Sequence, residues 1–274
     1  MSRTTFATLG LAFSALLLSG CTTVNELYPR FKEQSAHIRS MAVTTDVLIL
    51  EDVKGPLPLV DVPRDTALAE SISQYFRQEL EKRGYAVTTT EHSSIGLRYA
   101  SAVTPAIKVR AAGQSADLAL DALGTATGPF YLAPAYTEPA RRGSLQNAFE
   151  DMRRYIPKAG TPNVISRAVR ELGPLDGASH RLFVLVEGVQ VPMGKGLTQA
   201  LTTGLLSLGT VSVFQMTTVN FRIGLADAAT GEFILISDCT LAGGWTVDDA
   251  YLRRQAGVFF AHVDRLKNKP SNPN

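Results

Sequence analysis

The chain has 274 residues, of which 45% are hydrophobic, and it sets 27 Lys and Arg against 25 Asp and Glu. That length suits one sizeable domain or two small ones, and the apolar fraction is typical of a globular chain with a real core. No tract of lysine and arginine resembles a nucleic-acid footprint, so the near-neutral balance argues against nucleic acid as a partner.

The N-terminus has the layout of a secretory signal. Arg3 is the only charge before Glu26, and the stretch 6–18 is apolar but too short to span a bilayer as a helix. It ends in Leu18-Ser19-Gly20-Cys21, which resembles the lipobox of bacterial lipoproteins: an apolar residue, two small residues and a cysteine.

The lipobox resemblance implies cleavage between Gly20 and Cys21 and lipidation of Cys21 by acyl chains such as palmitate. Two or more acyl chains make membrane attachment effectively stable. Because Thr22 rather than aspartate follows the cysteine, the resemblance also implies the outer membrane, with the body facing the periplasm. Removal of the signal peptide, residues 1–20, leaves 254 residues. The alternative is an ordinary secretory signal with a chance cysteine.

Only one other cysteine is present. If Cys21 is lipidated, Cys239 has no intramolecular partner, so we expect no structural disulfide. Cys239 follows an apolar run and is expected to behave as a small buried hydrophobe; a reactive thiol is the alternative.

Residues 21–45 show no clear period and are expected to form a tether that leads from the lipid anchor to the body. The body, residues 46–266, is expected to be a single domain. Its first element is the short apolar run Val47–Leu50, which suits a buried strand.

A strand–helix–strand unit follows from the next elements. Asp65 is expected to cap a helix whose apolar residues recur every fourth position, and Gly84 stands where a left-handed C-terminal cap belongs. A second strand is expected from Tyr85. Such crossovers favour parallel strand pairing.

The middle segment, 93–143, shows no sustained period and is expected to be irregular. Two helices are predicted after it, one from Ser144 to Tyr155 and one from Asn163 to Leu172. The sequence LFVLVEGVQV at 182–191 then predicts a strand.

The C-terminal part has the clearest local pattern. Residues 219–225 alternate between apolar and other residues, 227–231 supply a turn, and 233–237 return as a second strand. Asp248 is expected to cap a final helix, and 267–274 should be a disordered tail. The expected fold is α/β (α+β): a mixed sheet flanked by helices, with a C-terminal β-hairpin followed by a helix.

Motifs that would supply chemistry fail on their spacing. Five rather than four residues separate Gly188 from Gly194, and Gly196 stands where a phosphate-binding loop has a Ser or Thr hydroxyl. Ser207 lacks the spacing of a nucleophile elbow. The histidines stand alone and are expected on the solvated surface: His37, His92, His180 and His262. We therefore expect no cofactor, no metal and no enzyme.

The order of the elements resembles that of envelope lipoproteins related to the N-terminal domain of the translocation protein TolB. That broad group includes the curli-secretion lipoprotein CsgG and the penicillin-binding-protein activator LpoB. The likeness rests on the lipobox, the strand Val47–Leu50, the helix ALAESISQYFRQELEKRGYAV, the strand 182–191 and the turn 227–231. It implies a mixed sheet without catalytic residues, a role played through protein partners and, for some members, assembly into rings.

Residues 196–221 contain no charged side chain. Leucines in the first half recur at helical spacing beside a stripe of small residues, and the later half alternates, so one transmembrane helix is not expected. The uncharged helical face packs in the core or forms an interface. The candidate interface residues are Gly196, Ala200, Leu201, Thr202, Gly204 and Leu206.

These features predict a non-enzymatic, lipid-anchored protein of the outer membrane that acts in envelope assembly, regulation or transport. Its expected partners are the membrane, through the anchor, and other envelope proteins; a homo-oligomer is left open. Two alternatives remain: an oligomeric secretion-channel component, and an envelope hydrolase whose site is built from scattered residues.

Overall fold

The computed structural model describes residues 24–25, 31–51, 59–94, 106–111, 114–119, 133–154, 164–191, 217–242 and 246–268. The strands are β1 (Val24–Asn25), β2 (Ser40–Glu51), β3 (Leu59–Asp61), β4 (Ala86–Ser93), β5 (Ala106–Ala111), β6 (Gln114–Ala119), β7 (His180–Gln190), β8 (Thr218–Asp227) and β9 (Phe233–Ala242). The helices are α2 (Phe31–Gln34), η1 (Ser35–His37), α3 (Val62–Lys82), η3 (Pro134–Tyr136), α4 (Pro139–Arg154), α5 (Arg167–Leu172) and α7 (Asp249–Asn268).

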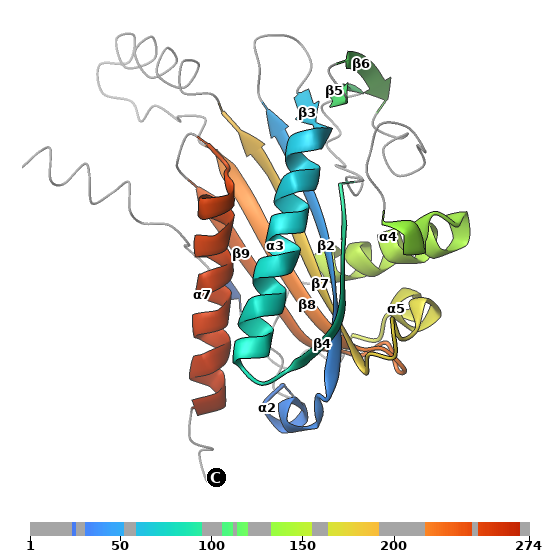
Figure 1. Ribbon diagram of the computed structural model, residues 1–274, viewed down its shortest axis with the longest axis vertical. Coiled ribbons are helices and arrows are strands. Elements are labelled where there is room, and N and C mark those ends of the chain that lie inside the picture. Colours follow the sequence, from blue (N-terminus) through green and yellow to red (C-terminus); the bar gives the residue numbers. More distant parts are fainter. Residues whose placement is uncertain are drawn as a thin grey trace, which may run out of the picture.

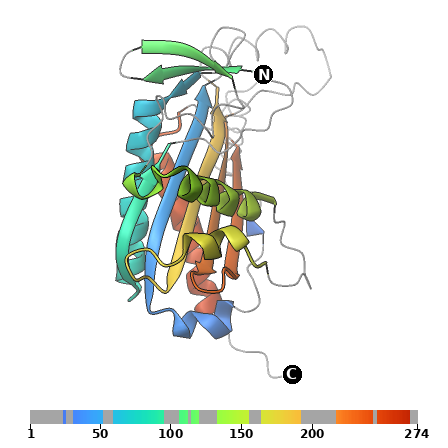
Figure 2. The same cartoon turned by 90° about the vertical axis from the view of Figure 1, so that its right-hand side faces the viewer.

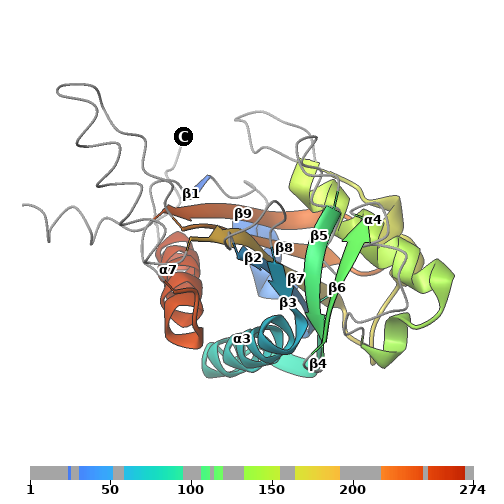
Figure 3. The ribbon, with the colours of Figure 1, turned by 90° about the horizontal axis from the view of Figure 1, so that it is seen from above.

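These strands form one mixed sheet in the order β1-β9-β8-β7-β2-β3-β5-β6, and β4 pairs with β2. Helices α3 and α7 cover one face of the sheet, and α4 and α5 lie on the other (Figures 1 and 3). The predicted α/β (α+β) class, a mixed sheet flanked by helices, is therefore confirmed.

Strand β2 runs through the centre of the sheet. It pairs in parallel with β4, as the predicted crossover requires, and in parallel with β7 from Met41 to Glu51. The predicted strand Val47–Leu50 is the second half of β2, which begins at Ser40. All but the end residues of β2 are buried, as expected for a parallel strand with helices over both faces.

Helix α3 begins earlier than predicted because Asp61, not Asp65, caps it. The Asp61 carboxylate accepts a hydrogen bond from the Arg64 backbone N–H at 3.3 Å. Asp65 is instead fully buried, and it accepts hydrogen bonds from the Ile49 N–H and the Arg64 side chain, both at 2.9 Å. Burial raises the pKa of Asp65 to about 7, against the opposing effect of Arg64. Asp65 thus fastens the start of α3 to the end of β2.

The middle of the chain is more regular than predicted. Within 93–143, β5 and β6 form an antiparallel hairpin, and β5 pairs in parallel with β3. The strands AIKVRA and QSADLA are six residues long, and the alternation from Ile107 to Arg110 in the first is too brief to make a sustained period. The prediction of an irregular segment is wrong for these residues.

Both helices of the α4–α5 pair differ from the prediction at their starts. Helix α4 begins at Pro139 rather than Ser144. Helix α5 begins at Arg167 rather than Asn163, because the Ser166 hydroxyl accepts a hydrogen bond from the Val169 N–H and caps it there.

The C-terminal hairpin and helix confirm the prediction. Strands β8 and β9 pair antiparallel, and the Asp227 carboxylate holds the turn by accepting from the Thr230 N–H at 2.7 Å. The Asp248 carboxylate accepts from the Tyr251 N–H at 2.7 Å at the start of α7, as a cap should. Helix α7 extends to Asn268, so residues 267 and 268 belong to the helix rather than to the predicted tail, and the rest of that tail lies outside the described residues.

The predicted tether, residues 21–45, is wrong for the part that the structure describes. Val24 lies opposite Cys239 in the pairing of β1 with β9. Phe31 is 3% exposed in the core, Ile38 is buried, and Ser40 already belongs to β2. The apolar residues of this segment fall at no regular spacing because each packs from a different short element.

Two hydrophobic cores sit on the two faces of the sheet. The core under α3 and α7 centres on Phe76, Phe221 and Phe260, and the core under α4 and α5 centres on Phe149 and Phe183.

The edge strand β1 lies on one side of the molecule, and α3 and β4 lie on the opposite side (Figures 2 and 3).

Gly231 closes the β8–β9 turn with φ +75°, and a Cβ there would lie 2.3 Å from the Ser166 carbonyl oxygen. Gly231→Ala is expected to destabilise the fold by about 3 kcal/mol, since left-handed strain and displacement of backbone both cost energy. Gly84 at φ +83° is the matched control, because a Cβ there meets nothing within 4 Å. Urea unfolding of both variants tests this: equal losses would show that the contact with Ser166 costs nothing.

Candidate functional site

Most of the residues singled out from the sequence lie outside the described residues. This holds for the cleavage and lipidation positions Gly20 and Cys21. It also holds for the whole candidate interface: Gly196, Ala200, Leu201, Thr202, Gly204 and Leu206. These assignments stay predictions.

Charged side chains from α4, β7, β8 and β9 gather on the α4 face of the sheet. We call Glu150, Arg153, Glu187, Arg222 and Asp238 the Glu187 cluster. Arg222 donates to Asp238 Oδ2 from Nε at 3.1 Å and from Nη2 at 3.0 Å, and to the Arg153 carbonyl at 3.0 Å. Arg153 Nε lies 3.6 Å from Glu187 Oε2, and its Nη1 lies 3.8 Å from Glu150 Oε2. The cluster joins the end of α4 to three neighbouring strands.

Glu187 is the most buried acid of the cluster, with its side chain 6% exposed. Burial raises the pKa of Glu187, and the guanidinium groups of Arg153 and Arg222 oppose that rise. Among the described residues, Glu187 Oε1 and Asp238 Oδ1 accept no hydrogen bond. The cluster therefore holds two cations among three carboxyl groups and has acceptor capacity left over.

Glu187→Gln is expected to change how stability depends on pH. Because the folded-state pKa of Glu187 is raised, the native state binds its proton more tightly than the unfolded chain does. The stabilisation that protonated Glu187 gives the fold is therefore complete below about pH 4.3, the ordinary glutamate pKa. It is lost as the pH rises through the folded-state pKa of Glu187. Urea midpoints measured between pH 4 and pH 8 should fall less steeply for Glu187→Gln than for the wild type. Glu150→Gln is the control, and an unchanged slope in Glu187→Gln would contradict the prediction.

A second polar group surrounds Arg181, whose side chain is fully buried. Arg181 donates to the Tyr136 hydroxyl, to Thr44 Oγ1 at 3.4 Å and to the Gly173 carbonyl at 3.3 Å. Its guanidinium also lies 5.5 Å from the centre of the Phe183 ring. Burial raises the pKa of Tyr136 to about 12, so its hydroxyl stays neutral. This group ties η3 and the end of α5 to the sheet.

Ser179, His180 and Asp227 bring a hydroxyl, an imidazole and a carboxylate together. Ser179 Oγ lies 2.8 Å from His180 Nδ1, and His180 lies opposite Asp227 in the β7–β8 pairing. The same hydroxyl donates to the Ser40 carbonyl at 2.9 Å. It has one proton, so Nδ1 must then donate to Ser179 rather than act as its base. The Asp227 carboxylate is engaged in its own turn. The group ties strand ends together rather than activating a nucleophile.

The prediction of solvated histidines is wrong for His180, which is 7% exposed. Burial lowers the pKa of His180, and it also lowers the pKa of the half-buried His92. Strand β7 brings His180 inside because it lies at the centre of the sheet, between β2 and β8. His37 is exposed, as expected.

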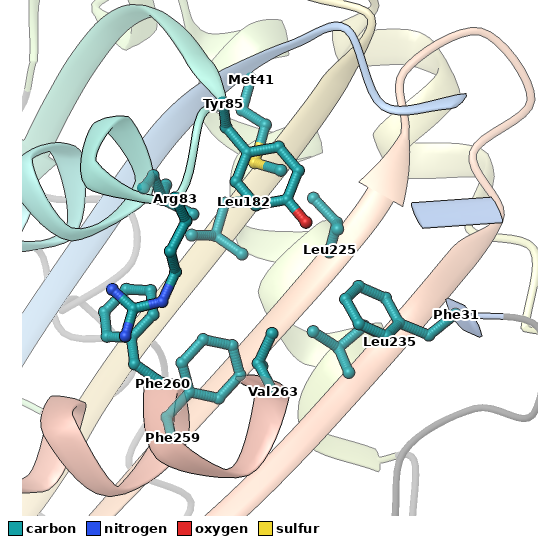
Figure 4. Close-up of a pocket in the computed structure, with 11 residues that line it drawn as sticks. Phe31, Met41, Arg83, Tyr85, Leu182, Leu225, Leu235, Phe259, Phe260 and Val263 are labelled. Carbon is teal, nitrogen blue, oxygen red and sulfur yellow. The ribbon is translucent and has the colours of Figure 1, made fainter. Parts of the chain in front are cut away.

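An apolar pocket lies between α2, α3, α7 and the sheet (Figure 4). It is lined by Phe31, Met41, Leu80, Arg83, Tyr85, Leu182, Leu225, Leu235, Phe259, Phe260 and Val263. Its volume of about 20 Å³ holds roughly one water molecule, whereas ligand pockets hold hundreds of cubic ångströms. Arg83 at the rim is already bound to Asp264 at 2.8 Å. The pocket is a packing gap rather than a ligand site.

Within the described ranges, no group of three or more His, Cys, Asp or Glu is placed to hold a metal ion. No helix of that part of the chain is long and apolar enough to cross a membrane.

Cys239 is disulfide-bonded, which contradicts the prediction that it has no partner. The sequence holds one other cysteine, Cys21, so a bond within one chain uses the sulfur that lipidation would take. The two fates of Cys21 are mutually exclusive, because each occupies the same sulfur. Cys239 is 7% exposed on β9, opposite Val24.

The Glu187 cluster is not predicted from the sequence, although two signals for it are visible there. Glu187 interrupts an otherwise apolar run, and Arg222 stands between apolar residues of an alternating strand. Their convergence with Arg153 depends on where α4 lies, which no local pattern reveals.

Comparisons with protein-family models, curated proteins and solved structures find no significant match to this chain.

Proposed function

We propose that this chain is a non-enzymatic lipoprotein of the outer membrane that acts through envelope protein partners in assembly, regulation or transport. The observation that carries the proposal is the sequence Leu18-Ser19-Gly20-Cys21 at the end of a short apolar signal. Thr22 after the cysteine favours the outer membrane, with the body in the periplasm. Lipidation at Cys21 would leave Cys239 without the disulfide that it forms in the structure, because Cys21 is its one possible partner within the chain.

Two polar groups of the described fold, around Ser179 and around Arg181, support a role without catalysis, because their hydrogen bonds hold elements of the fold together. Ser179 and His180 tie strand ends together, and Arg181 holds η3 to the sheet. A catalytic nucleophile instead needs a base that is free to take its proton.

Purification of the lipidated full chain from membranes in mild detergent, with size analysis, tests the role through partners. We expect a complex with another envelope protein. A lone monomer without a partner would contradict the proposal, and a closed ring of this chain alone would favour the secretion-channel alternative.

A matched variant, Thr202→Lys with Leu206→Lys, tests the candidate interface in the same experiment. Loss of the complex with unchanged circular dichroism would assign the association to residues 196–206. An unchanged complex would show that this segment is not the contact surface.

A further inference from the structure

We infer that the sheet edge formed by β1 and β9 is the side of the body that lies against the headgroups of the lipid bilayer. The inference rests on the proposed lipidation of Cys21. It adds the orientation of the body and the chemical class of the surface it meets.

The path from the lipid to the sheet is very short. Only Thr22 and Thr23 separate Cys21 from Val24, which pairs with Cys239 of β9. Three residue steps span at most about 10 Å. With one strand spacing of about 5 Å, the backbone of β9 lies within about 15 Å of the lipidated residue.

Residues 31–40, which follow further along the chain, pack against the body. Phe31 of α2 is 3% exposed and lines the pocket beside Leu235 and Val263 (Figure 4). Ile38 is buried, and β2 begins at Ser40. Detachment of α2 from the body would expose the Phe31 side chain to water, which costs about 2 kcal/mol or more.

A folded body attached to the lipid by so few residues can adopt few orientations on the bilayer. The acyl chains lie in the hydrocarbon layer, so Cys21 stays at headgroup depth. Because the body cannot enter the hydrocarbon, the edge that carries the anchor must face the membrane. Helix α3 and strand β4 lie on the opposite side of the molecule (Figures 2 and 3). Five strand spacings, roughly 24 Å, separate β1 from β4 along the sheet order.

The side chains nearest the anchor suit headgroups rather than hydrocarbon. Asp238 lies opposite Asn25 of β1 and opposite Arg222 of β8, so the Glu187 cluster begins at this edge. Arg222 and Asp238 are bound to each other and each keeps 19% of its side chain exposed, so they offer a polar surface that suits headgroups. Burial of the same charges in hydrocarbon would cost several kcal/mol each. The contact is therefore with the headgroup layer.

The test places a photoactivatable benzophenone side chain at two positions of the lipidated full chain in phosphatidylethanolamine–phosphatidylglycerol vesicles. Asn220 of β8 lies two strand spacings, about 10 Å, from β1. The control is Ala86, an exposed residue of β4. We expect the probe at Asn220 to form lipid adducts and the probe at Ala86 to form none. A probe at Asp238 replaces Asn220 if that variant does not fold.

A Gly-Ser spacer of about 12 residues, inserted between Thr23 and Val24, would let the body move roughly 20 Å from the bilayer. The lipid adducts of Asn220 should then be lost while the protein still floats with the vesicles. Equal adducts at both positions, or adducts unchanged by the spacer, would overturn the orientation. A wild-type protein that carries no lipid and does not float would instead contradict the lipoprotein assignment itself.

Discussion

Replacement of Cys21 by alanine is expected to move the protein from the membrane fraction to the soluble fraction. Without the cysteine no acyl chain can be attached, and two or more chains are what makes anchoring stable. The measurement is fractionation of cells that express each variant, with mass spectrometry of the N-terminal peptide. Continued membrane association of Cys21→Ala would contradict the lipoprotein assignment. Cys239→Ser is the control and should stay with the membrane.

Counting thiols on the wild-type protein separates the two fates of Cys21. A lipidated chain, denatured without reductant, should show one alkylatable thiol, Cys239, and a lipid mass on Cys21. A disulfide-bonded chain should show no thiol before reduction, two after it, and no lipid. The second pattern would keep Cys239 paired as in the structure and remove the anchor.

Local patterns predicted those elements whose side chains contact their sequence neighbours. The β8–β9 hairpin follows from a period of two and from an aspartate that holds its own turn. The start of α7 follows from Asp248, whose carboxylate caps a backbone N–H three residues on. In both cases the deciding interaction is local.

The predictions failed where a distant contact decides the outcome. Asp65 looks like a cap in sequence, but its carboxylate reaches the backbone of β2 at Ile49 and leaves the cap to Asp61. The supposed tether is held because Phe31 packs among residues of β9 and α7. Neither contact partner lies within one helical turn, so no periodicity could reveal it.

The Glu187 cluster was missed for the same reason. Its members come from α4 and three strands, and they meet because β7, β8 and β9 are neighbours in the sheet and α4 crosses them. An acid in an apolar strand signals that a partner exists, since a buried unpaired charge is too costly to keep. It does not say which residue the partner is.

The largest expected loss of stability comes from Phe76→Ala. Phe76 is fully buried in α3, with its ring centre 6.3 Å from that of Phe221 in β8 and 6.0 and 5.0 Å from those of Phe259 and Phe260 in α7. Truncation of such a phenylalanine to alanine costs about 3 to 5 kcal/mol, because transfer energy and ring contacts are lost and a cavity remains. The measurement is the free energy of unfolding in urea.

Gln74→Ala, on the exposed face of the same helix, is the control and should stay within about 0.5 kcal/mol of the wild type. A total stability of about 5 to 15 kcal/mol leaves little margin for the Phe76→Ala loss. Because Phe76 joins α3, α7 and the sheet, both helices should lose amide protection together in hydrogen exchange. A loss below about 1 kcal/mol, or exchange that rises in α3 alone, would show that α7 is held to the sheet independently of this residue.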